Sequence, residues 1–306
     1  MKIYINRQPR FGPWGGGAKT VNKLAESLLS AGHTVVYQLQ DKIDVMFCFD
    51  PRPNSFGEGI NHLYAYRQAF SKTKIIQRVG DVGTHSKPEL TKLVEYCLPR
   101  SDYFIFPSEW SMNYVNYSGA NHSIIYNSPM SDFYKNRNDN LQISSVPRIV
   151  THHWSTNAKK GFDTYKKFEE YCHDTGHFTF HYIGQTPPGV QFKKHTPPVA
   201  TDVLVDLLPS YDIYLTASEE EAGANHVLEA MACGLPVVYH GNGGSILEYC
   251  DSRGVCYNNF LELLESIRYI SENYSKYKKA CLQYQDTNDK VIEQYIDIIR
   301  RVHSES

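Results

Sequence analysis

Short apolar runs alternate with longer stretches in which apolar residues recur every three to four positions along this 306-residue chain. In the first half, residues 34–39, 44–49 and 74–79 are apolar runs of strand length. Before the first of them, an apolar stripe predicts a helix that ends at Gly32. This alternation predicts an α/β fold with parallel sheets covered by helices on both faces.

The second half repeats the same plan. Residues 148–152 and 212–216 predict buried strands, and the segment from Asn225 is rich in helix formers until Gly234 ends it. Between the halves, residues 134–147 are polar and rich in Asn, Asp and Ser. This stretch is therefore the predicted linker between two domains.

Composition narrows the class of protein. Apolar residues make up 41% and charged residues 21%, which is typical of a globular protein, and a net charge of −2 offers no general attraction to nucleic acid. No stretch approaches the roughly 18–20 apolar residues of a membrane span, and no signal-peptide core follows the first strand. Seven scattered cysteines favour reduced thiols over disulfides or a zinc site. We expect a cytoplasmic protein.

The strongest candidate chemistry lies at residues 218–238. Glu221 is in a loop, and Glu229 is about one turn into the helix from Asn225, roughly 6 Å along its axis. The N-terminus of a helix suits a phosphate or diphosphate, and carboxylates accept hydrogen bonds from sugar hydroxyls. The pattern indicates a nucleotide-sugar site. The structural alternative is a solvated acidic loop beside an ordinary amphipathic helix.

The same stretch resembles a known family. The run LEAMACGLPVV at 228–238, with Glu221 eight residues before Glu229, is similar to the E-x7-E signature of family 4 retaining glycosyltransferases. The resemblance implies that Glu221 contacts the transferred sugar and Glu229 the ribose of the donor. It also implies that the loop and helix start, made of Gly223, Ala224, Asn225 and His226, contribute to donor binding.

The family's GT-B fold implies two Rossmann-like domains that face each other across a cleft. On this basis we expect an acceptor-side domain at 1–145 and a donor domain at 146–286. The helix in 287–306 is expected to return to the first domain.

Two further motifs in the first half support the resemblance. A glycine-rich loop that includes Gly16 and Gly17, followed by LAESL at 24–28 and AGHTV at 31–35, resembles the family's opening segment near the donor phosphates and the acceptor. In the loop after the strand at 74–79, the family has a histidine close to the transferred sugar. Here Gly80 stands at that place, so the candidates are Asp81 and His85, against the alternative of a capped, solvated loop. The segments SDYFIFPSEWS (101–111) and IIYNSP (124–129) also match the family, in structural roles.

Half of the family's diphosphate clamp is present. Lys160 and Gly161 match its lysine and glycine, but Trp154 stands six residues before Lys160, where no arginine is found. His152 and His153 stand beside Trp154, and either one of these histidines, with His153 the donor-binding candidate, substitutes for that arginine, or the phosphates rest more on helix ends. Gly184 ends a predicted strand near the place where the family's nucleotide base packs.

The expected reaction is transfer of a sugar from a nucleotide-diphosphate sugar to an acceptor hydroxyl, with retention and without a metal or other cofactor. Glu221, Lys160, His85 and Asp81 are the candidate catalytic residues. The expected partners are the donor and a sugar, glycan or lipid-linked acceptor, which would allow peripheral membrane contact but no nucleic acid. Two alternatives stay open: a non-catalytic nucleotide-sugar-binding scaffold, and another GT-B enzyme such as a nucleotide-sugar epimerase.

Overall fold

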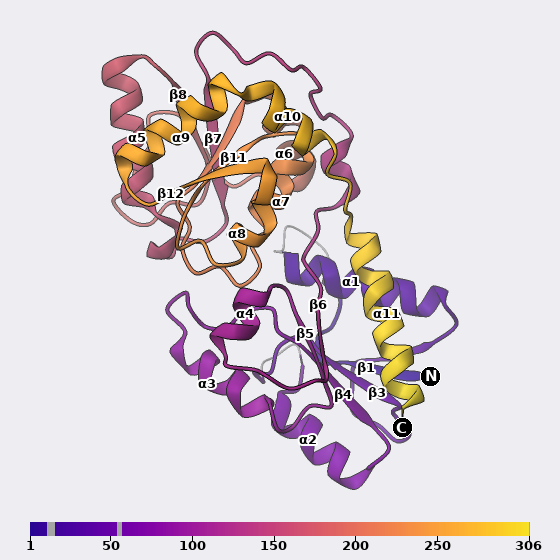
Figure 1. The fold of residues 1–306 in the computed structure, drawn as a ribbon. Helices are drawn as coiled ribbons and strands as arrows, with labels where there is room; N and C mark the ends of the chain where they lie inside the picture. The colour runs from indigo at the N-terminus through magenta and orange to yellow at the C-terminus, as the bar shows by residue number, and fades with distance from the viewer. Residues whose placement is uncertain (11–15, 54–56, 306) are drawn as a thin grey trace. The chain divides into compact units, whose positions relative to one another are not determined.

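The computed structural model describes residues 1–10, 16–53 and 57–305, so the glycines at 12 and 15 of the glycine-rich loop lie outside the described residues. The chain forms two compact units (Figure 1). The first consists of Met1–Asn127 with Asn288–Ser306, and the second of Ser128–Thr287.

A parallel six-stranded sheet forms the centre of the first unit, in the order β2-β1-β3-β4-β5-β6. Its strands are β1 (Lys2–Ile5), β2 (Thr34–Val36), β3 (Val45–Cys48), β4 (Lys74–Arg78), β5 (Tyr103–Phe106) and β6 (His122–Ile124). The expected strand at 34–39 is shorter than predicted. Its last aligned pair with β1 is Tyr4 with Val36, one residue before β1 ends at Ile5.

Five helices cover this sheet among the described residues: α1 (Gly16–Ser30), α2 (Ile60–Ala69), α3 (Pro88–Cys97), α4 (Glu109–Tyr114) and α11 (Asn288–Ser304). Helix α11 packs beside α1 (Figure 1) and inserts Tyr295 and Ile299 into the core that also contains Ile3 and Val45. The closing helix of the sequence is therefore part of the first unit.

The second unit has its own parallel six-stranded sheet, in the order β12-β11-β10-β7-β8-β9. Its strands are β7 (Arg148–His153), β8 (Thr179–Gly184), β9 (His195–Thr196), β10 (Ile213–Thr216), β11 (Val237–His240) and β12 (Gly254–Tyr257). The helices are α5 (Phe162–Thr175), α6 (Thr201–Leu207), α7 (Asn225–Ala232), α8 (Ser245–Cys250), α9 (Phe260–Glu272) and α10 (Tyr274–Leu282). The two sheets confirm the predicted α/β class with parallel strands.

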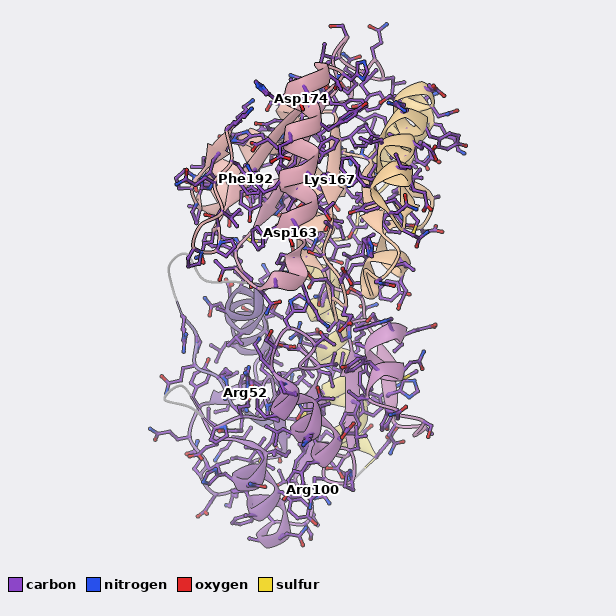
Figure 2. All side chains as sticks on the ribbon, turned by 90° about the vertical axis from the view of Figure 1, so that its left-hand side faces the viewer. Arg52, Arg100, Asp163, Lys167, Asp174 and Phe192 are labelled. Atoms are coloured by element: carbon purple, nitrogen blue, oxygen red, sulfur yellow. The ribbon has the colours of Figure 1, made fainter. Side chains whose placement is uncertain are left out.

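Helix α5 illustrates how the hydrophobic pattern places a helix on the sheet. Its exposed face carries Asp163, Lys167 and Asp174, which Figure 2 labels, while Phe168 and Tyr165 are fully buried. Because apolar positions repeat with the helical period, one side of α5 packs against the strands and the other meets solvent.

The change from one unit to the other falls at a different place from the predicted boundary at 145. Residues 128–145 pack with the second unit, where Phe133 is 1% exposed within the same core as Tyr214. Tyr134 donates a hydrogen bond to the carbonyl of Asp286 at 2.7 Å. Phe133 precedes the polar stretch at 134–147 and Tyr134 is its first residue, so these two aromatic side chains attach to the second unit a stretch whose polar composition predicted a linker.

Among the described residues, no helix combines the length and the apolar character needed to cross a membrane.

Candidate functional site

Several loops of the second unit follow the carboxyl ends of its parallel strands, the edge at which open α/β sheets bind ligands. Backbone hydrogen bonds tie these loops together. The amide of Glu219 donates to the carbonyl of Lys159 at 2.9 Å, and the amide of Glu220 donates to Asn242 O at 2.7 Å. Glu220 adopts a left-handed conformation with φ of 53°. The loop after β10 is therefore held by the loops after β7 and β11.

This arrangement brings together two residues that the sequence predicted separately. The ammonium group of Lys160 pairs with Oε1 of Glu221, and the two side chains are only 11% and 12% exposed. Lys160 ends a short 3₁₀ turn capped by Asn157, whose side chain accepts a hydrogen bond from Lys159 N at 3.0 Å. Beside it, Lys159 pairs with Glu220, but each of these side chains is 36% exposed.

Helix α7 begins directly after this loop. Asn225 is its first residue, and the N-cap residue Ala224 has no side-chain capping hydrogen bond. The amide of Ala224 donates to Oγ of Ser245 at 3.1 Å, and Gly223 precedes it with intermediate exposure. An N-terminus of this kind presents backbone N–H groups and a partial positive charge. The loop carboxylate of Glu221 is thus followed within four residues by a potential anion-binding helix end.

Glu229 lies one turn into α7 and is held by a partner that the sequence analysis named without assigning it this role. Oε2 of Glu229 lies 2.8 Å from Nε2 of His152, at the end of β7. His152 is 3% exposed, and its other ring nitrogen has no hydrogen-bond partner among the described residues. His152 therefore sets the position of the Glu229 carboxylate.

His153 and His226 are both buried. Nε2 of His153 lies 2.8 Å from the hydroxyl of Tyr165, and Nε2 of His226 lies 3.0 Å from Oγ1 of Thr216. Their ring centroids are 4.9 Å apart. Burial raises the pKa of Tyr165 to about 12, so its hydroxyl stays protonated as a donor. These contacts fix the positions of the two histidine rings.

Gly184 stands where no larger residue fits. It has a φ of +127°, and a Cβ added there would lie 1.9 Å from the carbonyl oxygen of His153. His153 and Gly184 line a small recess of about 10 Å³ together with Trp154. That volume is enough for about one water molecule.

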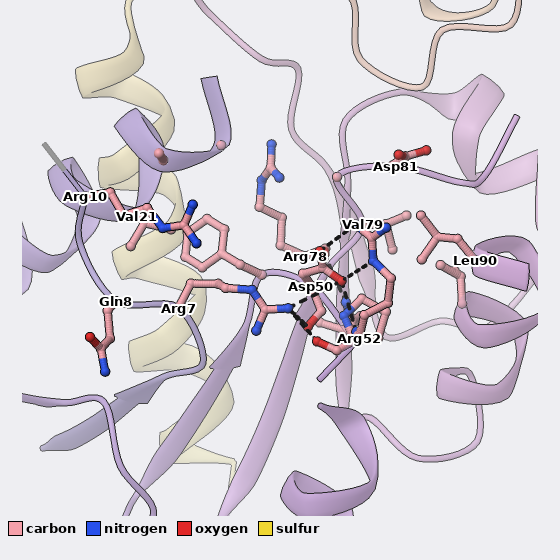
Figure 3. A pocket seen from close by; sticks show the side chains of 17 residues that line it. Arg7, Gln8, Arg10, Val21, Asp50, Arg52, Arg78, Val79, Asp81 and Leu90 are labelled. Atoms are coloured by element: carbon pink, nitrogen blue, oxygen red, sulfur yellow. Dashed lines mark hydrogen bonds and ion pairs between the residues drawn. The ribbon is translucent and has the colours of Figure 1, made fainter. Parts of the chain in front are cut away.

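The first unit contains a larger pocket of about 320 Å³ (Figure 3). Its lining includes Gly17, near the start of α1, and Gly80 and Asp81, which follow β4. Gly16 is the first residue of α1. His85 is not among the described residues that line this pocket.

Asp81 has two partners within its own loop. Its Oδ1 accepts a hydrogen bond from Gly83 N at 2.9 Å, and its Oδ2 pairs with Lys87 Nζ at 2.8 Å. Asp81 thus caps the loop and also borders the pocket.

Arginines dominate the polar lining of this pocket, and the sequence analysis assigned them no role. Arg7 and Arg10 follow β1, Arg52 follows β3, and Arg78 is the last residue of β4. They could have been found from one signal, because residues that follow neighbouring parallel strands gather at the same sheet edge. The strand order β1-β3-β4 provides that adjacency.

Asp50 organises part of the same lining. The guanidinium of Arg52 donates two hydrogen bonds to it, of 3.0 and 2.7 Å, and Arg7 Nη2 lies 3.5 Å from its Oδ1. Burial alone would raise the pKa of Asp50, but the hydrogen bonds from Arg52 lower it below its usual value. Asp50 is therefore ionised and neutralised by arginine. In the described part of the chain, no cluster of three or more His, Cys, Asp or Glu side chains is arranged to hold a metal ion.

Part of the second unit matches a known family. Residues 163–273 match the family described as glycosyl transferases group 1. An N-acetyl-alpha-D-glucosaminyl L-malate synthase of Bacillus anthracis is 30% identical over 105 residues, which cover 31% of this chain. The matched region spans only 27% of that relative.

Solved structures match nearly the whole chain. Sucrose-phosphate synthase from Thermosynechococcus elongatus has a TM-score of 0.69 at 14% identity and covers 100% of both chains. HepE of Anabaena, solved in complex with UDP and glucose, has a TM-score of 0.69 at 14% identity, covering 98% of this chain and 100% of that one. AviGT4, a glycosyltransferase of avilamycin A biosynthesis, has a TM-score of 0.62 at 16% identity, covering 100% of this chain and 98% of that one. The α/β architecture with two parallel sheets is thus the GT-B fold of such glycosyltransferases.

Proposed function

We propose that the protein is a glycosyltransferase, because residues 163–273 match the family described as glycosyl transferases group 1. It would transfer a sugar from a nucleoside-diphosphate sugar to an acceptor hydroxyl. The observation that carries this proposal is the Lys160–Glu221 pair at the loop that leads into the N-terminus of α7. A cation, a carboxylate and a helix end within one loop segment match the diphosphate and sugar of such a donor.

The pair also suggests how the donor is received. When no ligand is bound, Lys160 and Glu221 neutralise each other. The diphosphate of the donor would bind the Lys160 ammonium and the N–H groups at the start of α7. The Glu221 carboxylate, no longer paired with Lys160, would then accept hydrogen bonds from the transferred sugar. Glu229, held by His152, would accept hydrogen bonds from the ribose.

The proposed reaction retains the anomeric configuration. The acceptor oxygen forms a bond to the anomeric carbon on the face from which the diphosphate leaves, the carbon–oxygen bond to the diphosphate breaks, and the acceptor proton passes to an oxygen of that diphosphate. Lys160 and the α7 terminus would stabilise the negative charge that develops on the leaving group, and we propose that they do so without a metal or other cofactor. The first unit, with Asp81 and its pocket, would bind the acceptor.

We propose a cytoplasmic site of action, with peripheral membrane contact if the acceptor is lipid-linked. Support for the donor class comes from HepE, the fold relative that was solved with UDP and glucose.

The proposal is tested by donor hydrolysis. The protein is incubated with UDP-, GDP- and ADP-sugars, with and without EDTA, and release of the nucleoside diphosphate is measured. We expect slow hydrolysis of one donor class that EDTA does not change and that Glu221→Ala and Lys160→Ala abolish. Lys159→Ala is the matched control, since its exposed pair with Glu220 lies beside the site, and it should keep the wild-type rate. Tight donor binding without turnover across an acceptor panel would instead indicate a scaffold, and a changed nucleotide sugar without an acceptor would indicate an epimerase.

A further inference from the structure

The pocket of the first unit carries an excess of positive charge. Four arginines and two aspartates line it, which gives a formal charge of +2. Figure 3 shows Arg7, Arg10, Arg52 and Arg78 extending into it from the loops and strand ends around it. Both aspartates are already paired, Asp50 with Arg52 and Arg7, and Asp81 with Lys87.

Arg78 is an arginine of the pocket lining whose positive charge has no carboxylate partner among the described residues. It is only 8% exposed, and its recorded partners are neutral: Nε donates to the Tyr295 hydroxyl at 3.0 Å and Nη2 to Oδ1 of Asn127 at 3.3 Å. Its guanidinium also lies 5.7 Å from the ring centroid of Phe49. Across residues 1–10, 16–53 and 57–305, no carboxylate pairs with it. A buried cation without a counter-ion is costly, so an anion in the pocket would gain a strong partner.

A second buried group in the lining lacks a partner. Gln77 is completely buried, and its amide nitrogen donates to the carbonyl of Arg78 at 3.0 Å. Its Oε1 has no hydrogen-bond partner among the described residues. Gln77 Oε1 can accept a hydrogen bond from a ligand hydroxyl, and the Arg78 guanidinium can pair with an anionic group. The two together therefore suit a ligand that has a hydroxyl close to an anionic group.

We propose that this pocket binds a small acceptor that carries a carboxylate or phosphate group, with Arg78 as the main anion contact and Gln77 as the acceptor of a ligand hydroxyl. The inference rests on the proposed function, because it names the class of the substrate that receives the sugar. A volume of about 320 Å³ is at the lower end for ligand pockets, which favours an acceptor of monosaccharide size. Apolar side chains such as Phe49 and Leu90 line the remaining wall and can contact its carbon skeleton.

Calorimetric titration of the wild-type protein tests this inference directly. The probes are glucose, glucuronate and glucose 6-phosphate, which share a ring and differ in charge, together with inorganic phosphate. We expect at least one charged sugar to bind ten or more times as tightly as glucose. The comparison of glucuronate with glucose 6-phosphate separates a carboxylate site from a phosphate site. Equal affinity for glucose and the charged sugars, or no saturable binding of any anion, would overturn the inference.

Amino-acid substitutions test whether the anion binds in this pocket. Arg78→Met should weaken binding of the preferred anion at least tenfold. Because Arg78 also contacts Tyr295, Gly80→Ala is the second variant: its Cβ would lie 2.4 Å from Nη1 of Arg78, so it displaces the guanidinium while the charge remains. Arg100→Met is the matched control, because Arg100 (labelled in Figure 2) does not line the pocket. Unchanged anion affinity in folded Arg78→Met or Gly80→Ala protein would contradict the assignment.

The two proposals fail in different ways. Donor hydrolysis in the absence of acceptor reports on the donor site that contains Lys160 and Glu221, and it does not require an acceptor in the pocket of the first unit. A protein that binds anions in the pocket but neither binds nor hydrolyses any nucleotide sugar would refute the glycosyltransferase function. A protein that hydrolyses a donor but transfers the sugar to glucose as efficiently as to its charged analogues would refute only the acceptor inference.

Discussion

The ion pair between Lys160 and Glu221 should contribute measurably to stability before any ligand is bound. Exposed pairs contribute about 0–1 kcal/mol, whereas removal of one member of a fully buried pair costs about 3–5 kcal/mol. With side chains 11% and 12% exposed, this pair falls between those limits, and we expect a coupling free energy of about 2 kcal/mol. Lys160→Met and Glu221→Gln should each destabilise the protein by about that amount.

A double-mutant cycle measures this coupling. Urea unfolding of the wild type, the two single variants and the double variant gives four free energies of unfolding, and the double variant should be about as stable as either single one. The pair Lys159–Glu220 is the matched control. It has the same residue types in the same two loops, but each side chain is 36% exposed, so its coupling should be below about 1 kcal/mol.

Ligand addition provides the second half of this prediction. A donor present at a hundred times its dissociation constant should add about 2.7 kcal/mol to the free energy of unfolding of the wild type. Lys160→Met should lose most of this gain, because the diphosphate loses its cation. Coupling that is equal in the two pairs, or donor stabilisation that survives in Lys160→Met, would refute the reasoning that this buried pair opens to receive the donor.

Three other predictions follow from single contacts. His152→Leu should weaken nucleotide-sugar binding about tenfold in calorimetry, because Glu229 loses its 2.8 Å partner, and His152→Gln should recover part of that loss. Gly184→Ala should lower the free energy of unfolding by about 3 kcal/mol, whereas Gly189→Ala, with φ of +84° but open space around it, should cost about 1 kcal/mol. Burial lowers the pKa of His181 from 6.5 to about 4, so the unfolded state binds more protons between those pH values. Stability should therefore be full above pH 6.5 and fall by up to about 3 kcal/mol as the pH drops to 4, and His181→Asn should flatten that decline in urea unfolding.

Hydrophobic periodicity was sufficient to predict the α/β class because buried parallel strands are continuous apolar runs. It could not predict where each strand ends. The run at 34–39 continues beyond Val36, yet its pairing with β1 stops there, because pairing depends on the backbone of a distant segment and not on local hydrophobicity. Likewise, Phe133 is an anchor of the second core next to a polar stretch, and only tertiary packing reveals it.

The candidate site, too, was only partly predictable from the sequence. Glu221 and Lys160 were predicted from local sequence, but they are 61 residues apart, and a single sequence does not state that they pair. The 77-residue separation of His152 and Glu229 hid that contact in the same way. The arginine pocket depends on the order β1-β3-β4, which places Arg7, Arg52 and Arg78 at one edge. Strand order is decided by packing between distant segments and is not encoded in local periodicity.

The packing of α11 in the first unit has a consequence for folding during synthesis on the ribosome. The whole second unit, Ser128–Thr287, is synthesised between the two segments that build the first. At about 5–20 residues per second, its 160 residues (287 − 128 + 1) take roughly 8–32 s to emerge. During that interval the first sheet lacks Tyr295 and Ile299 and keeps an apolar face uncovered. We therefore expect the incomplete first unit to be the part of the nascent chain that most needs a chaperone. The second unit is continuous in sequence and can fold as soon as it has emerged.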